Sequence, residues 1–179
     1  GQQAAAFARQ AGSSNTQRLN DLAEKAQADA LAIRERKGGS ERKATIRKEM
    51  AKTMEDGCGI YRTAETMQST CAKLAELKER YKQVQVDDHS QAWNTEWLLG
   101  IELGYLIDVA QAMAHSALLR KESRGSHQRL DGYEARDDVN FLRHSLAYYT
   151  GDGPPRIDYG AVKITSSQPG TRAYGAAGE

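Results

Sequence analysis

The chain has 179 residues and a formal net charge of +1, from 25 Lys and Arg against 24 Asp and Glu. This length fits one compact domain, or a helical domain with a small appendage. Because the charges balance, no large field of one sign favours nucleic acid or an anionic membrane as a partner. With 7% aromatic and 27% charged residues, the composition favours a charge-covered helical protein over an aromatic-rich β-sandwich.

Membrane insertion and secretion are both disfavoured by the sequence pattern. No stretch approaches the roughly 18 to 20 apolar residues that a membrane span requires, and no basic segment with an apolar core precedes a cleavage site. Residue 1 is Gly rather than Met, and apolar, helix-forming residues follow at once. We therefore expect residues 1–15 to be the remnant of a preceding domain or linker.

The N-terminal part contains two predicted helices. Residues 2–10 resemble the end of a helix, and residues 12–15 are typical of a stop followed by an N-cap. Apolar residues then recur at helical spacing from Leu19 to Ile33. Residues 37–40, Lys-Gly-Gly-Ser, are expected to break this second helix.

Two more helices are predicted before residue 90. Ser40 is a natural N-cap for a helix that runs through Met54, and Gly57 and Gly59 are expected to end it. Thr63 can cap the following helix, although a full capping box would need Glu or Gln at position 66, where the chain has Thr. That helix is amphipathic, with apolar positions spaced by three and four: Met67, Cys71, Leu74, Leu77, Tyr81 and Val84.

The longest predicted helix covers residues 94–121 and is the most apolar. We expect it to be buried on a broad face because it carries two apolar stripes. The first is Leu99, Leu103, Leu106, Ala110, Met113 and Ala117, and the second is Leu98, Ile101, Tyr105, Val109 and Ala112. The remaining, polar stripe is Glu96, Gly100, Gly104, Asp108, Gln111 and His115. Glycine inside a helix costs about 1 kcal/mol relative to alanine, so its two glycines are expected to permit close backbone approach.

After residue 131 the character of the chain changes. Residues 137–139 are expected to form a loop, and two strands then flank a Gly- and Pro-rich turn at 150–155, which predicts a β-hairpin. From Ser166 the tail is small and polar. The predicted fold is therefore mainly α, an antiparallel bundle of three to four helices over residues 1–131, with a β-hairpin appendage and loose tail over 132–179.

Neither the cysteines nor the histidines form a site with catalytic or metal-binding spacing. Cys58 and Cys71 match no metal or redox motif and are expected to be reduced, packed thiols; a reactive Cys58 between two glycines is the alternative, with help only from Arg62. The four histidines lack the i, i+4 spacing of a helical zinc site. There is no dinucleotide fingerprint and no phosphate loop, so no catalytic, cofactor-binding or metal residue is assigned.

A polar segment at residues 120–131 follows the longest helix. It is rich in charged side chains, which are suited to contact another domain or subunit. Its arginine forks and Gly125 could form an anion site. The favoured interpretation is a helix C-terminus neutralised by Arg120 and Lys121, with Arg124 and Arg129 in interdomain ion pairs. The candidate interface residues between domains or subunits are Arg120, Glu122, Arg124, His127, Arg129 and Asp131.

Five segments in a fixed order resemble the C-terminal region of the fumarate reductase flavoprotein subunit. They are residues 54–63, 74–81, 94–96, 114–131 and 137–142, and the resemblance extends over about residues 41–174. Succinate dehydrogenase flavoproteins share the Glu-Ser-Arg-Gly-x-His pattern of 122–127, and L-aspartate oxidase has a related one. Residues 58–62 and 158–165 are most similar to the fumarate reductase branch.

The resemblance implies a parent oxidoreductase of anaerobic respiration that reduces fumarate to succinate with FAD and electrons from an iron-sulfur subunit. It also implies a bacterial complex on the cytoplasmic face of the inner membrane. The flavin-linked histidine and catalytic arginines of the family have no counterpart in this chain. We therefore expect an inactive support domain that contacts the upstream flavin domain, the iron-sulfur subunit and a flavinylation assembly factor.

Two alternatives remain open at this point. The first is the same domain of a succinate dehydrogenase flavoprotein, which differs in the direction of the parent reaction. The second is a free-standing helical interaction module without catalysis, whose gene would begin near residue 1 with its own start codon.

Overall fold

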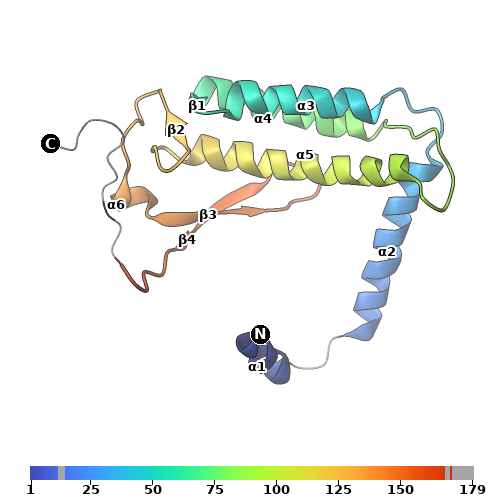
Figure 1. The fold of residues 1–179 in the computed structure, drawn as a ribbon, viewed down its shortest axis with the longest axis horizontal. Coiled ribbons are helices and arrows are strands. Elements are labelled where there is room, and N and C mark those ends of the chain that lie inside the picture. Colours follow the sequence, from blue (N-terminus) through green and yellow to red (C-terminus); the bar gives the residue numbers. More distant parts are fainter. Residues whose placement is uncertain (12–14, 168–169, 171–179) are drawn as a thin grey trace. The chain divides into compact units, whose positions relative to one another are not determined.

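The structure, a computed structural model, describes residues 1–11, 15–167 and 170. The fold is mainly α, with long helices followed by a small antiparallel hairpin, as predicted (Figure 1). The elements group into two compact units, which are described separately here. The first unit comprises residues 1–51 and 76–107, and the second comprises 52–75 and 108–179. The expected domain boundary after residue 131 stays a prediction.

The two N-terminal helices of the first unit form where the sequence predicts them. Helix α1 covers Gln2–Gln10 and helix α2 covers Thr16–Glu35. Asn15 caps α2, because its side-chain oxygen accepts a hydrogen bond of 3.1 Å from the backbone N–H of Arg18. Residues 12–14 of the predicted helix stop lie outside the described residues.

Helix α3, Lys43–Cys58, differs from its prediction at both ends. Ser40 is not its N-cap, because Glu41 instead pairs with Val84 in an isolated parallel bridge and the helix begins only afterwards. Gly57 lies inside the helix, which ends at Cys58, directly before the predicted Gly59. The helix therefore begins later than the cap at Ser40 predicts, because the backbone of Glu41 pairs with the distant Val84.

Helix α4, Ala64–Tyr81, begins at the predicted cap. The backbone N–H of Thr66 donates to the Thr63 hydroxyl and the N–H of Thr63 donates to the Thr66 hydroxyl, both at 3.2 Å. Thr66 thus has the role that Glu or Gln has in a capping box. A Cβ on Gly57 would overlap the Thr70 hydroxyl and lie 2.8 Å from the Thr66 carbonyl oxygen, so this glycine is required by the packing of α4.

The predicted apolar face of residues 67–84 is confirmed as core. Five of its six members are buried, and Tyr81 is half-buried. The buried members are Met67, Cys71, Leu74, Leu77 and Val84.

Helix α5, Thr95–Leu119, turns inward a face that overlaps the predicted one only in part. Gly100 and Gln111, both from the expected polar stripe, are buried together with Leu103, Ile107 and Ala114. Members of the two expected apolar stripes are between 37% and 67% exposed: Leu98, Leu99, Tyr105, Leu106, Val109 and Met113. Leu103 and Ala110 of the first stripe are buried, so the expected burial of the stripes is confirmed only in part.

The glycines of α5 explain the inward face. The Tyr81 hydroxyl donates to the Gly100 carbonyl at 2.9 Å, and a Cβ on Gly104 would lie 2.8 Å from the same hydroxyl oxygen. The predicted close approach at these glycines is confirmed, and it is this approach that brings the glycine stripe toward the rest of the unit.

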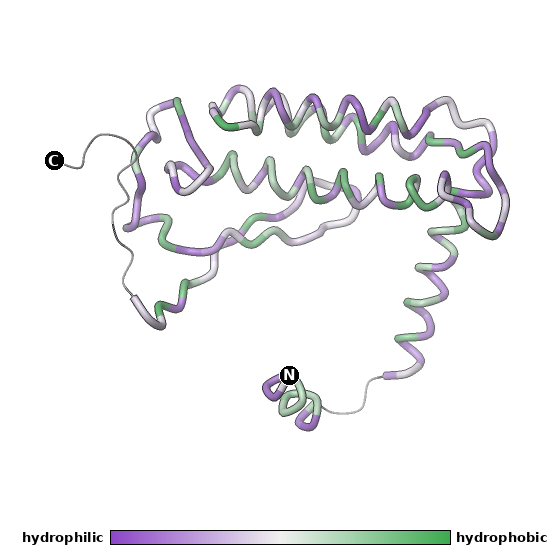
Figure 2. The backbone as a smooth tube through the Cα atoms, in the orientation of Figure 1, coloured by the Kyte–Doolittle hydropathy of each residue, from purple (hydrophilic) through white to green (hydrophobic). Residues whose placement is uncertain are grey.

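Helix α5 is also long and apolar enough to cross a membrane by length and composition, which corrects the expectation that no such stretch exists. Figure 2 shows its hydrophobic residues spread along its length. In its most apolar stretch, 33% of the residues are buried.

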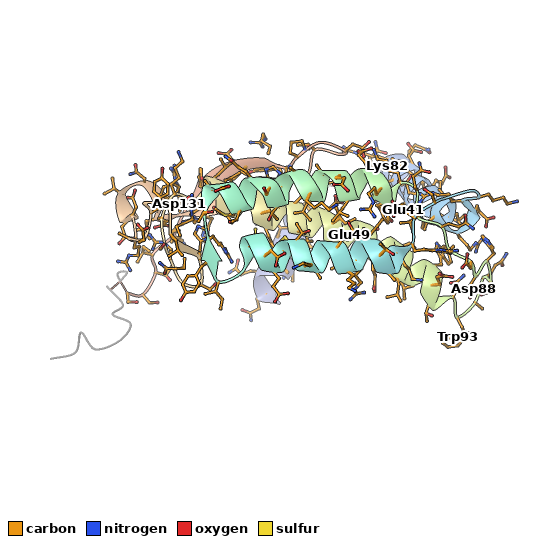
Figure 3. All side chains as sticks on the ribbon, turned by 90° about the horizontal axis from the view of Figure 1, so that it is seen from above. Glu41, Glu49, Lys82, Asp88, Trp93 and Asp131 are labelled. Atoms are coloured by element: carbon orange, nitrogen blue, oxygen red, sulfur yellow. The ribbon has the colours of Figure 1, made fainter. Side chains whose placement is uncertain are left out.

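A short loop in the first unit presents an exposed tryptophan. Trp93 is 98% exposed and has a positive φ of 58°, and Figure 3 shows it pointing away from the ribbon near Asp88. The Asn94 amide donates to the carbonyls of Asp88 at 2.7 Å and Ser90 at 3.0 Å. These bonds hold the loop in a conformation that is unfavourable for a bulky residue.

An ion-pair cluster also belongs to the first unit. Arg80 pairs with Glu41 and Glu49, both labelled in Figure 3, with shortest distances of 2.7 Å to each carboxylate. Lys43 pairs with Glu96 at 2.8 Å. The hydrogen bond from Lys43 is the main reason why the pKa of Glu96 falls to about 2.

The second unit contains the short elements of the fold. Strand β1, Tyr61–Arg62, pairs in parallel with strand β2, Gln128–Arg129, a contact that local patterns did not predict. Helix α6, Asp138–Phe141, replaces part of the loop that was expected at 137–139. Asp137 caps it by accepting a 2.9 Å hydrogen bond from the backbone N–H of Asn140.

The predicted β-hairpin is confirmed in the second unit. Strand β3, Arg143–Tyr148, pairs antiparallel with strand β4, Arg156–Ala161, and Ser145 lies opposite Tyr159 (Figure 1). Gly151 in the connecting turn has a φ of +86°, which glycine adopts without strain. Of the predicted tail, residues 168–169 and 171–179 lie outside the described residues.

Candidate interface site: the 120–131 network

The second unit brings all six predicted interface residues into one hydrogen-bonded network, here called the 120–131 network. It begins where α5 ends and continues through β2. Its members are Arg120, Glu122, Arg124, His127, Arg129 and Asp131. Glu122 is fully buried and Arg129 is 1% exposed, so the sequence places two ionised groups in the interior.

Glu122 is the central carboxylate of this network. Arg124 binds it with two nitrogens, Nε at 2.8 Å and Nη2 at 2.9 Å, and Arg120 binds it through Nη1. The backbone N–H of Asp137 donates to it at 2.9 Å. Burial alone would raise the pKa of Glu122, but these hydrogen bonds outweigh burial and lower it. The carboxylate is therefore ionised and fully bound by its own chain.

Arg129 and Asp131 form a second, two-point ion pair. The distances are 2.8 Å from Nε to Oδ1 and 2.6 Å from Nη2 to Oδ2. Arg129 Nη1 also donates to the carbonyls of Leu118 and Arg120, at 3.2 and 3.1 Å. The other end of the pair meets α4, where the N–H of Ala64 donates to Asp131 at 2.6 Å (Figure 3).

His127 is held in the neutral form by its neighbours. Arg62 Nη1 lies 2.9 Å from Nδ1, which must accept because a guanidinium only donates. Nε2 therefore carries the proton and donates to the carbonyl of Arg120 at 3.1 Å. Burial and the charges of Arg62, Arg129 and Arg120 lower the pKa of His127 against the opposing effect of that carbonyl. Both ring nitrogens are engaged, so His127 is not placed as a general base.

The network reaches the rest of the second unit through partners that sequence reasoning missed. Arg124 binds Asp138 at 2.6 Å, and Arg136 binds the same carboxylate at 2.7 Å. Arg120 donates to the Phe141 carbonyl at 3.0 Å and to the Ser145 hydroxyl at 3.2 Å. Asp138, Phe141 and Ser145 lie 14 to 25 positions from the network arginines that bind them, and no short-range pattern connects them.

The structure modifies the favoured interpretation of this segment. Arg129, rather than Arg120 and Lys121, donates to the carbonyls at the end of α5. Arg124 and Arg129 are in ion pairs, as expected, but with residues of the same unit. The chemistry of the network is therefore structural: it secures the end of α5 to β2, α4, α6 and the hairpin.

The cysteines follow the packed-thiol interpretation. Both are free; Cys71 is buried and Cys58 is half-buried. Burial raises the pKa of Cys58, with a smaller opposing effect of Arg62, and burial raises that of Cys71 to about 11. A raised pKa reduces the thiolate fraction and contradicts a reactive thiol. Within the described ranges, no group of three or more His, Cys, Asp or Glu side chains could hold a metal.

Comparison with known proteins places this chain among flavoprotein subunits. The family model described as fumarate reductase flavoprotein C-term matches residues 47–174. A fumarate reductase flavoprotein subunit from Serratia sp. is 61% identical over 138 residues, which are 76% of this chain and 23% of that protein. A succinate dehydrogenase flavoprotein subunit from Rickettsia felis is 34% identical over 123 residues, which are 69% of this chain and 20% of that protein.

A solved structure agrees with these matches. A chain of Escherichia coli quinol fumarate reductase superimposes with a TM-score of 0.88 at 49% identity, covering 97% of this chain and 30% of that chain. The present chain thus spans roughly a quarter of the length of the relatives that it matches. With the family model covering well over half of its residues, the chain belongs to the fumarate reductase flavoprotein C-terminal family.

Proposed function

We propose that this chain is the C-terminal support and interaction domain of a fumarate reductase flavoprotein subunit. The whole protein reduces fumarate to succinate with FAD and with electrons from an iron-sulfur subunit. The observation that carries the proposal is the 61% identity to a protein named fumarate reductase flavoprotein subunit, against 34% to one named succinate dehydrogenase flavoprotein subunit. The support role rests on the 120–131 network, whose groups are directed at their own chain.

The described residues do not fit FAD. Strand β1 leads into α4 beside a parallel strand, which is where a dinucleotide fold places its phosphate-binding turn. Here the residue at the turn is Thr63 rather than a glycine-rich loop, and the Asp131 carboxylate already accepts the N–H of Ala64 at 2.6 Å. A second anion at this helix end would be repelled. We therefore assign FAD to the upstream flavin domain of the whole protein, and no chemical step to this chain.

Three partners follow from this function: the upstream flavin domain of the same polypeptide, the iron-sulfur subunit and a flavinylation assembly factor. The exposed apolar side chains of α5, among them Tyr105, Val109 and Met113, support a role in contact. A quinol-fumarate reductase with menaquinol is among the similar solved structures. We place the complex on the cytoplasmic face of a bacterial inner membrane.

The direct test is to purify the whole subunit through a tag at the C-terminal end of this sequence. Flavin content, fumarate reduction by reduced methyl viologen and succinate oxidation are then measured. We expect bound FAD and faster fumarate reduction than succinate oxidation, while the 179-residue chain alone is inactive. Faster succinate oxidation would favour the succinate dehydrogenase alternative, and fumarate reduction by the 179-residue chain alone would contradict the support role.

The interface role of the 120–131 network needs a separate test. Arg124→Ala or Arg129→Ala in the whole subunit is expected to weaken assembly with the iron-sulfur subunit or to lower flavin retention. Arg156→Ala is the matched control, because Arg156 is an exposed arginine whose ion pair is with Asp158, at 3.2 Å, in its own strand and outside the network. Unchanged flavin content, assembly and activity in both network variants would refute the role.

A further inference from the structure

We propose that a cavity in the second unit binds a carboxylate group carried on a short hydrocarbon stem, and that the guanidinium of Arg143 is its main ligand. The cavity has a volume of about 390 Å³, toward the lower end of the range for ligand pockets. It lies where the end of α5, α6 and the start of β3 meet. Its lining comprises three arginines, two other polar residues and three apolar residues: Arg120, Arg124, the exposed Arg143, His144, Ser145, Phe141, Leu142 and Val162.

Arg143 is positioned by aromatic rings and not by an acid. Its guanidinium carbon lies 4.2 Å from the ring centroid of Tyr159 and 5.5 Å from that of Phe141. These two rings meet edge to face, with centroids 5.9 Å apart. A guanidinium that rests on ring faces keeps its in-plane N–H donors available. The Tyr159 ring is itself held, because its hydroxyl donates to the Leu119 carbonyl at 3.1 Å.

Among the described residues, the charges around the cavity leave the exposed Arg143 without an acidic partner. Arg120 and Arg124 share the buried Glu122, and Arg124 also pairs with Asp138. For the Arg143 side chain, no ion pair or hydrogen bond is found within the described part of the chain, and no carboxylate lines the cavity there. A bound carboxylate would therefore neutralise the positive charge of Arg143. The loss of side-chain entropy on binding would be small, because ring stacking already restricts the arginine side chain.

The apolar part of the lining selects the kind of anion. Phe141, Leu142 and Val162 can pack against methylene groups, which a bare inorganic anion lacks. Of the polar lining residues, Ser145 already accepts a hydrogen bond from Arg120 at 3.2 Å. A planar guanidinium fork binds a carboxylate through two parallel hydrogen bonds. The ligand is therefore a small organic acid or an acidic side chain of a protein segment, both of which offer the same group on the same stem.

Titration of the 179-residue chain, followed by NMR of the arginine Nε–H signals and backbone amides, tests the proposal. The probes are butyrate, the peptide acetyl-Gly-Glu-Gly-amide with its Gln analogue, and inorganic phosphate, all at matched ionic strength. Arg143→Gln removes the proposed ligand and Arg143→Lys keeps only its charge. Arg156→Gln is the control, because Arg156 also stacks on a tyrosine, at 4.1 Å from the Tyr148 ring centroid, but has Asp158 as a partner.

We expect butyrate or the Glu peptide to shift the signals of Arg143 and Phe141 in the wild type and in Arg156→Gln. Affinity should fall at least tenfold in Arg143→Gln and less in Arg143→Lys. If butyrate binds, a free organic acid is a sufficient ligand for the cavity. If the Glu peptide binds and butyrate does not, the ligand is an acidic side chain of a protein segment. Phosphate binding as tight as butyrate, an equal loss in Arg156→Gln, or no shift at Arg143 with any carboxylate would overturn the proposal. Because the wild-type shift map locates binding by itself, a variant that fails to fold leaves the test intact.

Discussion

Arg129 and Asp131 form a two-point ion pair, 2.8 and 2.6 Å long, that connects the C-terminal end of α5 to the first turn of α4. The arginine binds the last carbonyls of α5, including that of Leu118, and the aspartate binds the backbone N–H of Ala64. Opposite helix ends carry opposite partial charges, and each member of the pair carries the sign that suits the end that it contacts. One pair of side chains thus satisfies backbone groups of two helices.

Replacing Arg129 by Met should therefore be strongly destabilising. The guanidinium is 1% exposed, and its removal leaves Asp131 without its positive partner and takes one donor from the carbonyls of Leu118 and Arg120. Breaking a buried pair from one side typically costs about 3–5 kcal/mol. Urea unfolding of the 179-residue chain measures this cost, with Arg156→Met, at an exposed pair, as the control. A loss below about 1 kcal/mol would show that the network is not a stabilising junction.

Stability should fall as the pH falls from about 4 to about 2, in part because of Asp131. Hydrogen bonds from Arg129 lower the pKa of this carboxyl from 3.8 to about 2. In the unfolded chain the group takes up its proton near its usual pKa, so the stabilisation is complete above that pKa and is lost as the pH falls through the folded value. Glu96, in the first unit, behaves similarly, because its pKa is also lowered to about 2.

The measurement that isolates Asp131 is the slope of the unfolding free energy against pH between 4 and 2. In Asp131→Asn this slope should be shallower than in the wild type, although the variant is less stable at pH 7. Glu96→Gln should reduce the slope independently, because the two groups share no partner. An unchanged slope in Asp131→Asn would show that the carboxylate is not specifically stabilised in the folded state.

Gly57→Ala should destabilise the chain although alanine is the better helix former. The methyl group would overlap the Thr70 hydroxyl and lie 2.8 Å from the Thr66 carbonyl oxygen. Overpacking typically costs about 1–3 kcal/mol, which exceeds the gain of about 1 kcal/mol from helix propensity. Adding Thr70→Ala removes the hydroxyl and should restore part of the loss in thermal or urea unfolding. A more stable Gly57→Ala single variant would contradict the close packing of α3 on α4.

Trp93 should be one of the few positions where glycine is more stabilising than alanine. Its φ of 58° lies in the left-handed region, and the 98% exposed side chain loses no packing when it is removed. The left-handed conformation costs a non-glycine residue roughly 1–2 kcal/mol. We therefore expect Trp93→Gly to unfold at a higher urea concentration than Trp93→Ala. The reverse order would mean that the loop does not hold this backbone conformation in solution.

Local sequence signals were reliable where a helix or turn depends on neighbouring residues. The Asn15 and Thr63 caps, the apolar face from Met67 to Val84 and the Gly151 turn were predictable because each depends on residue types and spacings within one short segment. Ser40 shows where this reasoning fails. Ser40 does not cap α3, because the backbone of Glu41 pairs with the distant Val84. No local pattern predicts that pairing.

The orientation of α5 could not be deduced from its residue types. Its apolar stripes are large, and hydrophobicity alone directs them inward, yet the helix turns Gly100 and Gly104 toward Tyr81. Small residues permit the closest backbone approach, and the partner that exploits it lies on another helix. Leu103 and Ala110 of the first stripe are buried as well, whereas members of the second stripe, among them Tyr105 and Val109, stay exposed.

The sequence by itself determined the family, the helical class with its hairpin, and the concentration of charged groups at residues 120–131. Only the tertiary structure decided what those charges do. Arg120, Arg124 and Arg129 bind carboxylates and carbonyls of their own chain, whereas Arg143, which no motif distinguishes, is left without an acidic partner in the described part of the chain. Pairing between charged groups depends on separation in space, and folding sets that separation independently of distance along the chain.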